Sequence, residues 1–161
     1  MNTERVDRGQ GRVMGDAATP LTTAERRFAV LLRVAALLFV ACAAGFLLRP
    51  EEVIHGLGLP GVHIGLPPLA TVDLAVESDF WFAFVVANMA TNAAGCWLAA
   101  GDIRGRRTLV YAVVVSMLVV SGTAALVFVR WSPAFPFLAI ALAALPVALI
   151  LLRGLNRTRA A

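Results

Sequence analysis

Four apolar stretches, each long enough to cross a lipid bilayer, constrain this chain more than any other feature. They run over residues 28–48, 80–100, 109–129 and 135–152. At the rise of an α-helix, about 20 residues cover roughly 30 Å, which matches the hydrocarbon core of a bilayer. Hydrophobic residues make up 60% and charged residues 15% of the sequence, outside the range typical of soluble domains. The sequence therefore predicts an all-α integral membrane protein, a bundle of four transmembrane helices.

The segments outside these stretches define the expected domain organisation. Residues 1–21 are polar and lack periodicity, which predicts a flexible tail, and residues 154–161 form a second tail. A four-helix membrane domain over 22–153 lies between them. Thr22 and Glu25 have the spacing of a capping box, so we expect the first helix to begin there.

One long loop, over residues 49–79, connects the first two spans. Pro50 followed by two glutamates is typical of the first turn of a short helix within this loop. A loop of this length usually has a function or partial order, and its Gly, Pro and aliphatic residues predict contact with the bundle mouth or the headgroups. His55 and His63 permit a metal or haem site, but packing within the loop is the simpler interpretation, and we predict no metal site.

Arginine accounts for all 14 basic residues, and its distribution predicts the orientation of the spans. Twelve arginines lie in or beside the two tails and the connection between the second and third spans, whereas only Arg49 and Arg130 lie on the opposite side. The positive-inside rule therefore places both termini in the cytoplasm and the 49–79 loop outside it. The arginines are dispersed around apolar spans, so the expected partner is the lipid bilayer and not nucleic acid.

Polar side chains within the spans are the candidate site. Asn88 and Asn92 lie one helical turn apart in the second span, where an unpaired amide costs several kcal/mol in hydrocarbon. Depth along the antiparallel third span places Ser121 level with Asn88 and Ser116 close to Asn92. We predict that both asparagines point into the bundle and pack the helices together, in a polar ladder in which Ser116, Ser121 or Thr123 is the hydrogen-bond partner. The alternatives are a ligand, quinone or proton site lined by the asparagines, and a seam for another subunit.

Catalytic signatures are scarce. The sequence has no GxxxxGK[ST] loop, no HExxH, no GxSxG, and no acidic residue within an apolar span. If the chain is an enzyme, the candidate acid or base is Glu77 or Asp79 at the outer mouth, because an apolar mouth raises the pKa of a carboxyl group. No cofactor is expected under the main hypothesis, and a quinone is the alternative.

Two stretches carry a resemblance to a known group of proteins. "GFLLRPEEVIHGLGLP" at the end of the first span and "SDFWFAFVVANM" at the entry to the second resemble the small bacterial four-helix membrane proteins of the DoxX-like group. The resemblance covers residues 28–150. It implies a four-helix bundle in the inner membrane of a bacterium, and some members of the group are linked to quinone-dependent or oxidative membrane systems.

Two function hypotheses follow from the sequence. The first is a non-catalytic accessory or assembly subunit of a larger membrane complex, with other membrane proteins or further copies of itself as partners. The second is a membrane-embedded enzyme or a lipid- or quinone-binding protein, of isomerase or cyclase type, that acts on an apolar substrate at the outer mouth.

Overall fold

Helices make up nearly all of the part of the chain that the structure describes. This computed structural model describes residues 20–66, 77–130 and 135–158, apart from the side chains of residues 58 and 77–82. The helices are α1 (Thr23–Leu48), α2 (Pro50–His63), α3 (Glu77–Gly101), α4 (Arg107–Arg130) and α5 (Phe135–Arg157). All except α2 are long and apolar enough to cross a membrane. The all-helical architecture with four apolar helices is thus confirmed.

Local sequence signals explain where the helices begin. The Glu25 backbone N–H donates to Thr22 Oγ1 over 3.2 Å, and the Thr22 backbone N–H donates to Glu25 Oε2 over 2.8 Å. This reciprocal pair is the predicted capping box. Helix α2 begins at Pro50, where the missing N–H of proline costs nothing, and its 14 residues lie within the expected loop. Helix α3 begins at Glu77, three residues before the expected start of the second span. Helix α5 continues to Arg157, past the expected end of the fourth span at residue 152.

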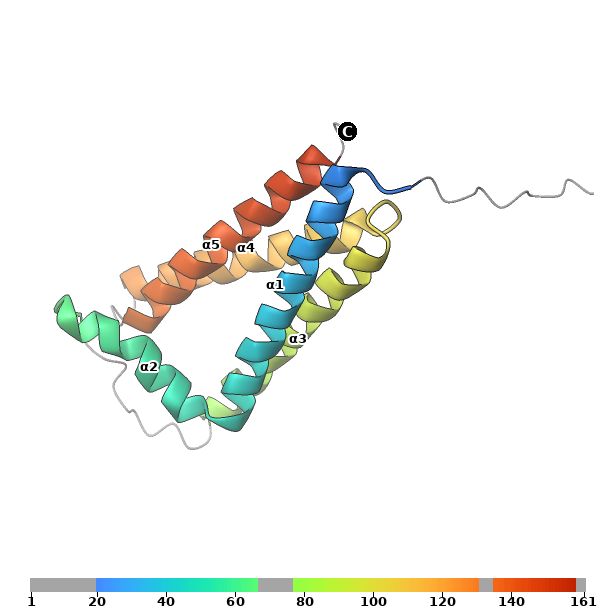
Figure 1. Ribbon diagram of the computed structural model, residues 1–161. Helices are drawn as coiled ribbons and strands as arrows, with labels where there is room; N and C mark the ends of the chain where they lie inside the picture. The colour runs from blue at the N-terminus through green and yellow to red at the C-terminus, as the bar shows by residue number, and fades with distance from the viewer. Residues whose placement is uncertain (1–19, 67–76, 131–134, 159–161) are drawn as a thin grey trace, which may run out of the picture.

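The four long helices pack mainly as two antiparallel pairs, α1 with α3 and α4 with α5 (Figure 1). Small side chains allow close approach in both pairs. Ala36 of α1 and Ala93 and Ala99 of α3 are buried in the first pair, and Ala144 and Ala148 of α5 are buried in the second. Contacts between α3 and α4 join the two pairs.

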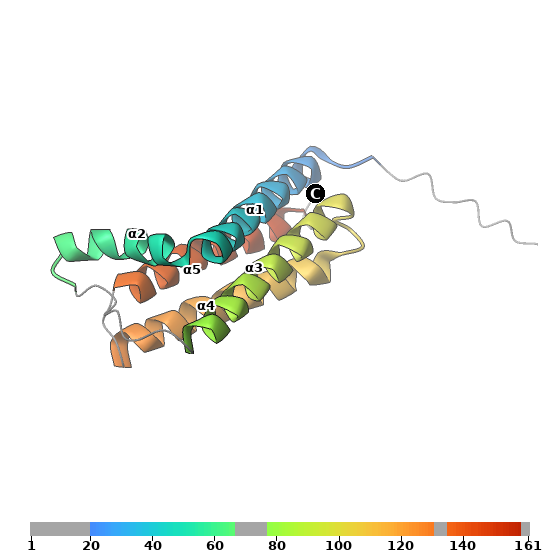
Figure 2. The same cartoon turned by 90° about the horizontal axis from the view of Figure 1, so that it is seen from below.

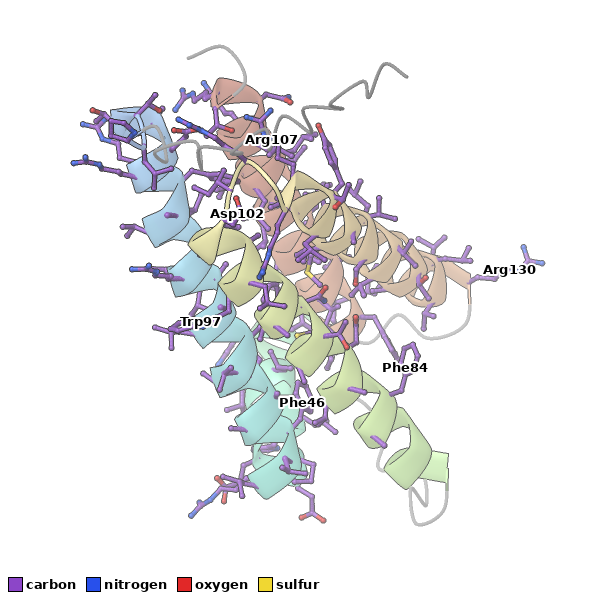
Figure 3. The ribbon with its side chains drawn as sticks, turned by 90° about the vertical axis from the view of Figure 1, so that its right-hand side faces the viewer. Phe46, Phe84, Trp97, Asp102, Arg107 and Arg130 are labelled. Atoms are coloured by element: carbon purple, nitrogen blue, oxygen red, sulfur yellow. The ribbon has the colours of Figure 1, made fainter. Side chains whose placement is uncertain are left out.

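The pairs meet at one end of the molecule and diverge toward the other (Figures 1 and 3). We call the first the arginine end; it holds the start of α1, the connection 102–106 between α3 and α4, and the end of α5. The opposite end, where α1 and α4 finish, is the splayed end. Figure 2 shows α2 extending from the end of α1 along the start of α5, and α2 contacts both helices.

The hydrophobic core lies toward the arginine end. Its buried side chains come from residues 28–39 of α1, 93–100 of α3, 110–117 of α4 and 144–155 of α5, with Ile103 from the α3–α4 connection. None of the described side chains of α2 belongs to this core. Packing therefore joins the four long helices over only part of their length.

Candidate functional site

Asn88 and Asn92 of α3 and Ser116 of α4 form a closed set of three hydrogen bonds, two of which join the helices. Asn92 Nδ2 donates to Asn88 Oδ1 over 3.2 Å and to Ser116 Oγ over 3.2 Å. The Ser116 hydroxyl donates to Asn88 Oδ1 over 3.0 Å. Asn92 is buried, whereas Asn88 and Ser116 are half-buried. We call these three residues the polar trio.

Backbone spacing on each helix positions the trio. Asn88 and Asn92 are four residues apart on α3, so their side chains are neighbours on one face. One turn further along α3, a Cβ atom on Gly95 would lie 3.0 Å from Val113 Cγ2 of α4. Glycine at this position therefore allows α4 to approach closely, and Ser116, the next turn of α4 after Val113, comes within reach of both asparagines.

The trio leaves part of its hydrogen-bonding capacity unused. Within the described residues, no hydrogen bond involves the Asn88 amide nitrogen or the Asn92 amide oxygen. The nitrogen is a donor and the oxygen an acceptor, so a ligand that carries an acceptor beside a donor could pair with both. The arrangement can therefore hold α3 against α4, and it can also accommodate one further polar group.

Ser121, another candidate partner in the predicted ladder, does not join the trio. Its hydroxyl donates to the Ala141 carbonyl of α5 over 2.9 Å, in a buried position. Five residues separate Ser116 from Ser121, which turns the two side chains apart by about 140° around the helix axis. Of these two candidate partners, Ser116 therefore pairs with the asparagines and Ser121 does not, because the helix face, and not depth alone, decides the partner. Ser121 instead ties α4 to α5.

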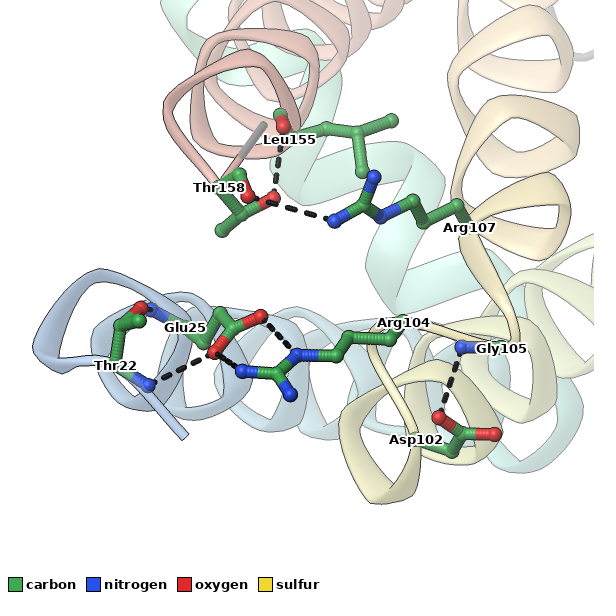
Figure 4. A network of polar contacts seen from close by, with 8 residues as sticks. All are labelled: Thr22, Glu25, Asp102, Arg104, Gly105, Arg107, Leu155 and Thr158. Carbon is green, nitrogen blue, oxygen red and sulfur yellow. Dashed lines mark hydrogen bonds and ion pairs between the residues drawn. The ribbon is translucent and has the colours of Figure 1, made fainter. Parts of the chain in front are cut away.

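A second polar cluster, which the sequence analysis did not predict, lies at the arginine end (Figure 4). Arg104 donates through Nε to Glu25 Oε1 over 2.7 Å and through Nη2 to Glu25 Oε2 over 2.8 Å. The Glu25 side chain is only 4% exposed, and the same carboxylate caps α1. These hydrogen bonds raise the pKa of Arg104 above its ordinary value.

One signal in the sequence could have indicated this ion pair. Glu25 lies three and seven residues before Phe28 and Leu32, so the helical period places it on the face that those side chains bury. A carboxylate on a buried face requires a partner. Nothing in the local sequence identifies that partner as Arg104, which is 79 positions away.

Arg107 makes a separate contact at the same end. Its Nη2 donates to the Thr158 carbonyl over 3.4 Å, and the Thr158 hydroxyl donates to the Leu155 carbonyl over 2.8 Å (Figure 4). The buried Arg107 Nε has no hydrogen-bond partner within the described ranges. Arg104 thus links the α3–α4 connection to α1, while Arg107 links α4 to the end of α5.

The structure places only some of the remaining candidate side chains. Glu77 is the first residue of α3 and Asp79 lies in its first turn, but both side chains fall outside the described part. His55 and His63 are exposed on α2. Among the described residues, no group of three or more His, Cys, Asp or Glu side chains could hold a metal ion.

The chain matches no family model, and neither a curated protein nor a solved structure is significantly similar to it. The resemblance to the DoxX-like group therefore stays a prediction.

Proposed function

We propose that this chain is a four-span membrane protein that serves, without catalysis of its own, as an accessory or assembly subunit of a larger membrane complex. The observation that carries the proposal is the composition of the α3 surface that is turned away from the bundle. Ala83, Ala87, Ala90 and Ala94 are all exposed, and their positions fall within an arc of about 60° around the helix. We call this set the alanine face.

The exposed surface of α1 is of a different kind. Val30, Val34, Leu37 and Leu38 are between 48% and 61% exposed, and such large aliphatic side chains suit contact with lipid chains. Small side chains, in contrast, allow a second helix to approach closely enough for extensive van der Waals contact within a membrane. The alanine face is therefore suited to a partner helix.

The polar trio supports a structural role for its residues. Two of its three hydrogen bonds, those of Ser116 with Asn88 and Asn92, join α3 to α4, and such bonds contribute about 0.6–2 kcal/mol each to helix association in membranes. They hold α3 in a fixed rotation against α4. A fixed rotation of α3 directs the alanine face away from the bundle.

The proposed topology places the arginine end in the cytoplasm. Among the described residues, this end carries a set of arginines around α1, the α3–α4 connection and α5, whereas the splayed end carries Arg49 and Arg130. By the positive-inside rule, both termini are cytoplasmic and α2 lies at the outer surface. The resemblance to the DoxX-like group is the reason for proposing the inner membrane of a bacterium.

Purification in mild detergent tests the proposed function. The expected result is a complex whose mass exceeds that of one chain and which is lost when Ala90→Leu and Ala94→Leu are combined. The control is Ala41→Leu, which adds the bulk of one such change to an exposed position of α1 and should leave the complex intact. A solitary, monodisperse chain in the wild type would contradict the proposal, and a complex of identical chains would identify the partner as further copies.

A second candidate function rests on the unused amide groups of the trio. A membrane-embedded enzyme of isomerase or cyclase type, or a lipid- or quinone-binding protein, would receive an apolar ligand at the splayed end. The ligand's polar atoms would pair with the Asn88 nitrogen and the Asn92 oxygen, and Glu77 or Asp79 would act as acid or base. Catalytic activity that is unchanged in both Glu77→Gln and Asp79→Asn would exclude this mechanism.

A further inference from the structure

The surface of α5 near the arginine end contains a shallow hollow. Its lining consists of one apolar and one polar group of side chains on the same helix: Leu149, Leu152, Arg153, Asn156 and Arg157. The apolar members lie toward the middle of the helix, and the polar members lie toward its end. We call this the α5 hollow.

The two arginines of the α5 hollow differ from those in the polar contacts at the same end. Arg104 is paired with Glu25, and Arg107 donates to the Thr158 carbonyl. Arg153 and Arg157 are exposed and make no hydrogen bond or ion pair within the part of the chain that the structure describes. Their positive charges are therefore not neutralised by a described carboxylate.

Spacing brings the polar groups of the hollow together. Arg153 and Arg157 are four residues apart, so their guanidinium groups are neighbours on one face of α5, with the Asn156 amide beside them. Guanidinium groups bind phosphate oxygens through paired, charge-assisted hydrogen bonds, and an amide nitrogen adds a further donor. This set of donors suits a phosphate.

The apolar part of the hollow indicates the source of that phosphate. Leu149 lies four residues before Arg153, which places it about 6 Å deeper along the helix. A free phosphate ion has no use for an apolar wall, whereas an acyl chain attached to the phosphate would lie along Leu149 and Leu152. Basic hollows on the cytoplasmic side of membrane helices are suited to anionic lipid headgroups in this way.

We propose that the α5 hollow binds one anionic phospholipid, with the headgroup phosphate between Arg153, Arg157 and Asn156 and an acyl chain along Leu149 and Leu152. This inference rests on the proposed function in requiring that the chain spans a membrane with the arginine end in the cytoplasm. It is independent of the alanine face, since the hollow lies on α5 and the alanine face lies on α3.

Native mass spectrometry of the detergent-purified full-length protein tests the proposal with phosphatidylglycerol and phosphatidylcholine as probes. We expect preferential retention of phosphatidylglycerol by the wild type. The combined change Arg153→Gln and Arg157→Gln should weaken that retention on the order of tenfold, because two guanidinium contacts to phosphate are lost. The matched control is Arg26→Gln with Arg27→Gln, which removes the same charge from the same end outside the hollow and should change retention by less than about twofold.

Three results would overturn the proposal. Equal retention of the two lipids would show that the phosphatidylglycerol headgroup is not selected. An equal loss in the control variant would show diffuse attraction by the whole arginine end. Displacement of the lipid by soluble glycerol 3-phosphate at comparable concentration would show a headgroup site without a lipid chain.

A separate measurement distinguishes this failure from failure of the proposed function. Alkaline carbonate extraction of cell membranes shows whether the wild type and both arginine variants are inserted. A chain that is extracted as a soluble protein contradicts both proposals. An inserted chain that shows no preference for phosphatidylglycerol, and still loses its complex in the Ala90→Leu, Ala94→Leu variant, contradicts only the lipid site.

Discussion

At the arginine end, side chains from all four long helices are enclosed, whereas at the splayed end the corresponding helices expose large apolar side chains. Leu32 of α1 and Leu155 of α5 are 0% exposed. Leu47 and Leu48 of α1 and Val129 of α4 are between 69% and 81% exposed. The same helices thus form a packed bundle in one part and separate surfaces in another.

The ion pairs at the two ends also differ in how far their side chains are exposed. The Glu25 side chain, paired with Arg104, is 4% exposed, while Arg49 and Glu52 pair at 2.7 Å with side chains 70% and 66% exposed. At the splayed end, α2 contacts α5 where Gly61 lies against Phe135, and a Cβ atom on Gly61 would overlap that ring. Most of the packing that stabilises the fold therefore lies at the arginine end, so equivalent substitutions should have different effects at the two ends.

The largest difference in the free energy of unfolding should come from a Leu→Ala substitution made once in the packed part of α1 and once at its splayed end. Leu32→Ala should lower the free energy of unfolding in detergent by about 2–3 kcal/mol, the low part of the range for buried leucine, because an apolar solvent already surrounds the separated helices. Leu47→Ala, at 69% exposure, should cost less than about 0.5 kcal/mol. Thermal or denaturant unfolding of both variants checks this, and equal losses would contradict the comparison.

A substitution that adds volume to the packed end should lower the free energy of unfolding by a slightly smaller amount. A Cβ atom on Gly154 of α5 would overlap the buried Phe28 ring, so Gly154→Ala should cost about 1–2 kcal/mol after the gain in helix propensity. Gly122 of α4 has no atom within 4 Å of such a Cβ, so Gly122→Ala is the matched control. Unfolding of the control should show unchanged or slightly increased stability. A loss in the control as large as that in Gly154→Ala would show that the overlap is not the cause.

The polar trio lies between the two ends, where α3 contacts α4. If it holds α3 against α4, Asn88→Leu and Asn92→Leu should each cost about 1–2 kcal/mol through lost hydrogen bonds and added bulk. If it lines a ligand site, Asn88→Leu should leave stability nearly unchanged and weaken ligand binding. We expect the first outcome; a loss below about 0.5 kcal/mol for both variants in an unfolding assay in detergent would contradict it.

The smallest change in stability should come from Glu→Gln substitutions in the ion pairs. Glu25→Gln should lower the unfolding temperature, since it removes the charge that the Arg104 guanidinium contacts in two places but retains one acceptor oxygen. Glu52→Gln should leave the unfolding temperature unchanged, because exposed ion pairs contribute little. High salt should leave the effect of Glu25→Gln largely intact, because the Glu25 side chain is only 4% exposed. The reverse order of effects would contradict the assignment of stability to the arginine end.

Features that depend on local sequence were predictable. The four apolar stretches follow from hydropathy and length, the start of α1 from the Thr22–Glu25 capping box, and the start of α2 from Pro50. The neighbouring positions of Asn88 and Asn92 follow from the helical period. Each of these is determined within one continuous segment of the chain, so no knowledge of packing is required.

Contacts between distant segments were decided by the tertiary structure alone. Depth along a straight helix offered the asparagines both Ser116 and Ser121, but the rotation of α4 directs Ser116 to Asn88 and Asn92 and Ser121 to α5. The sequence by itself determined which residues form apolar helices and which polar groups need partners. The tertiary structure decided the partners and the divergence of the helix pairs, because tilt and rotation depend on the packing of all four helices together.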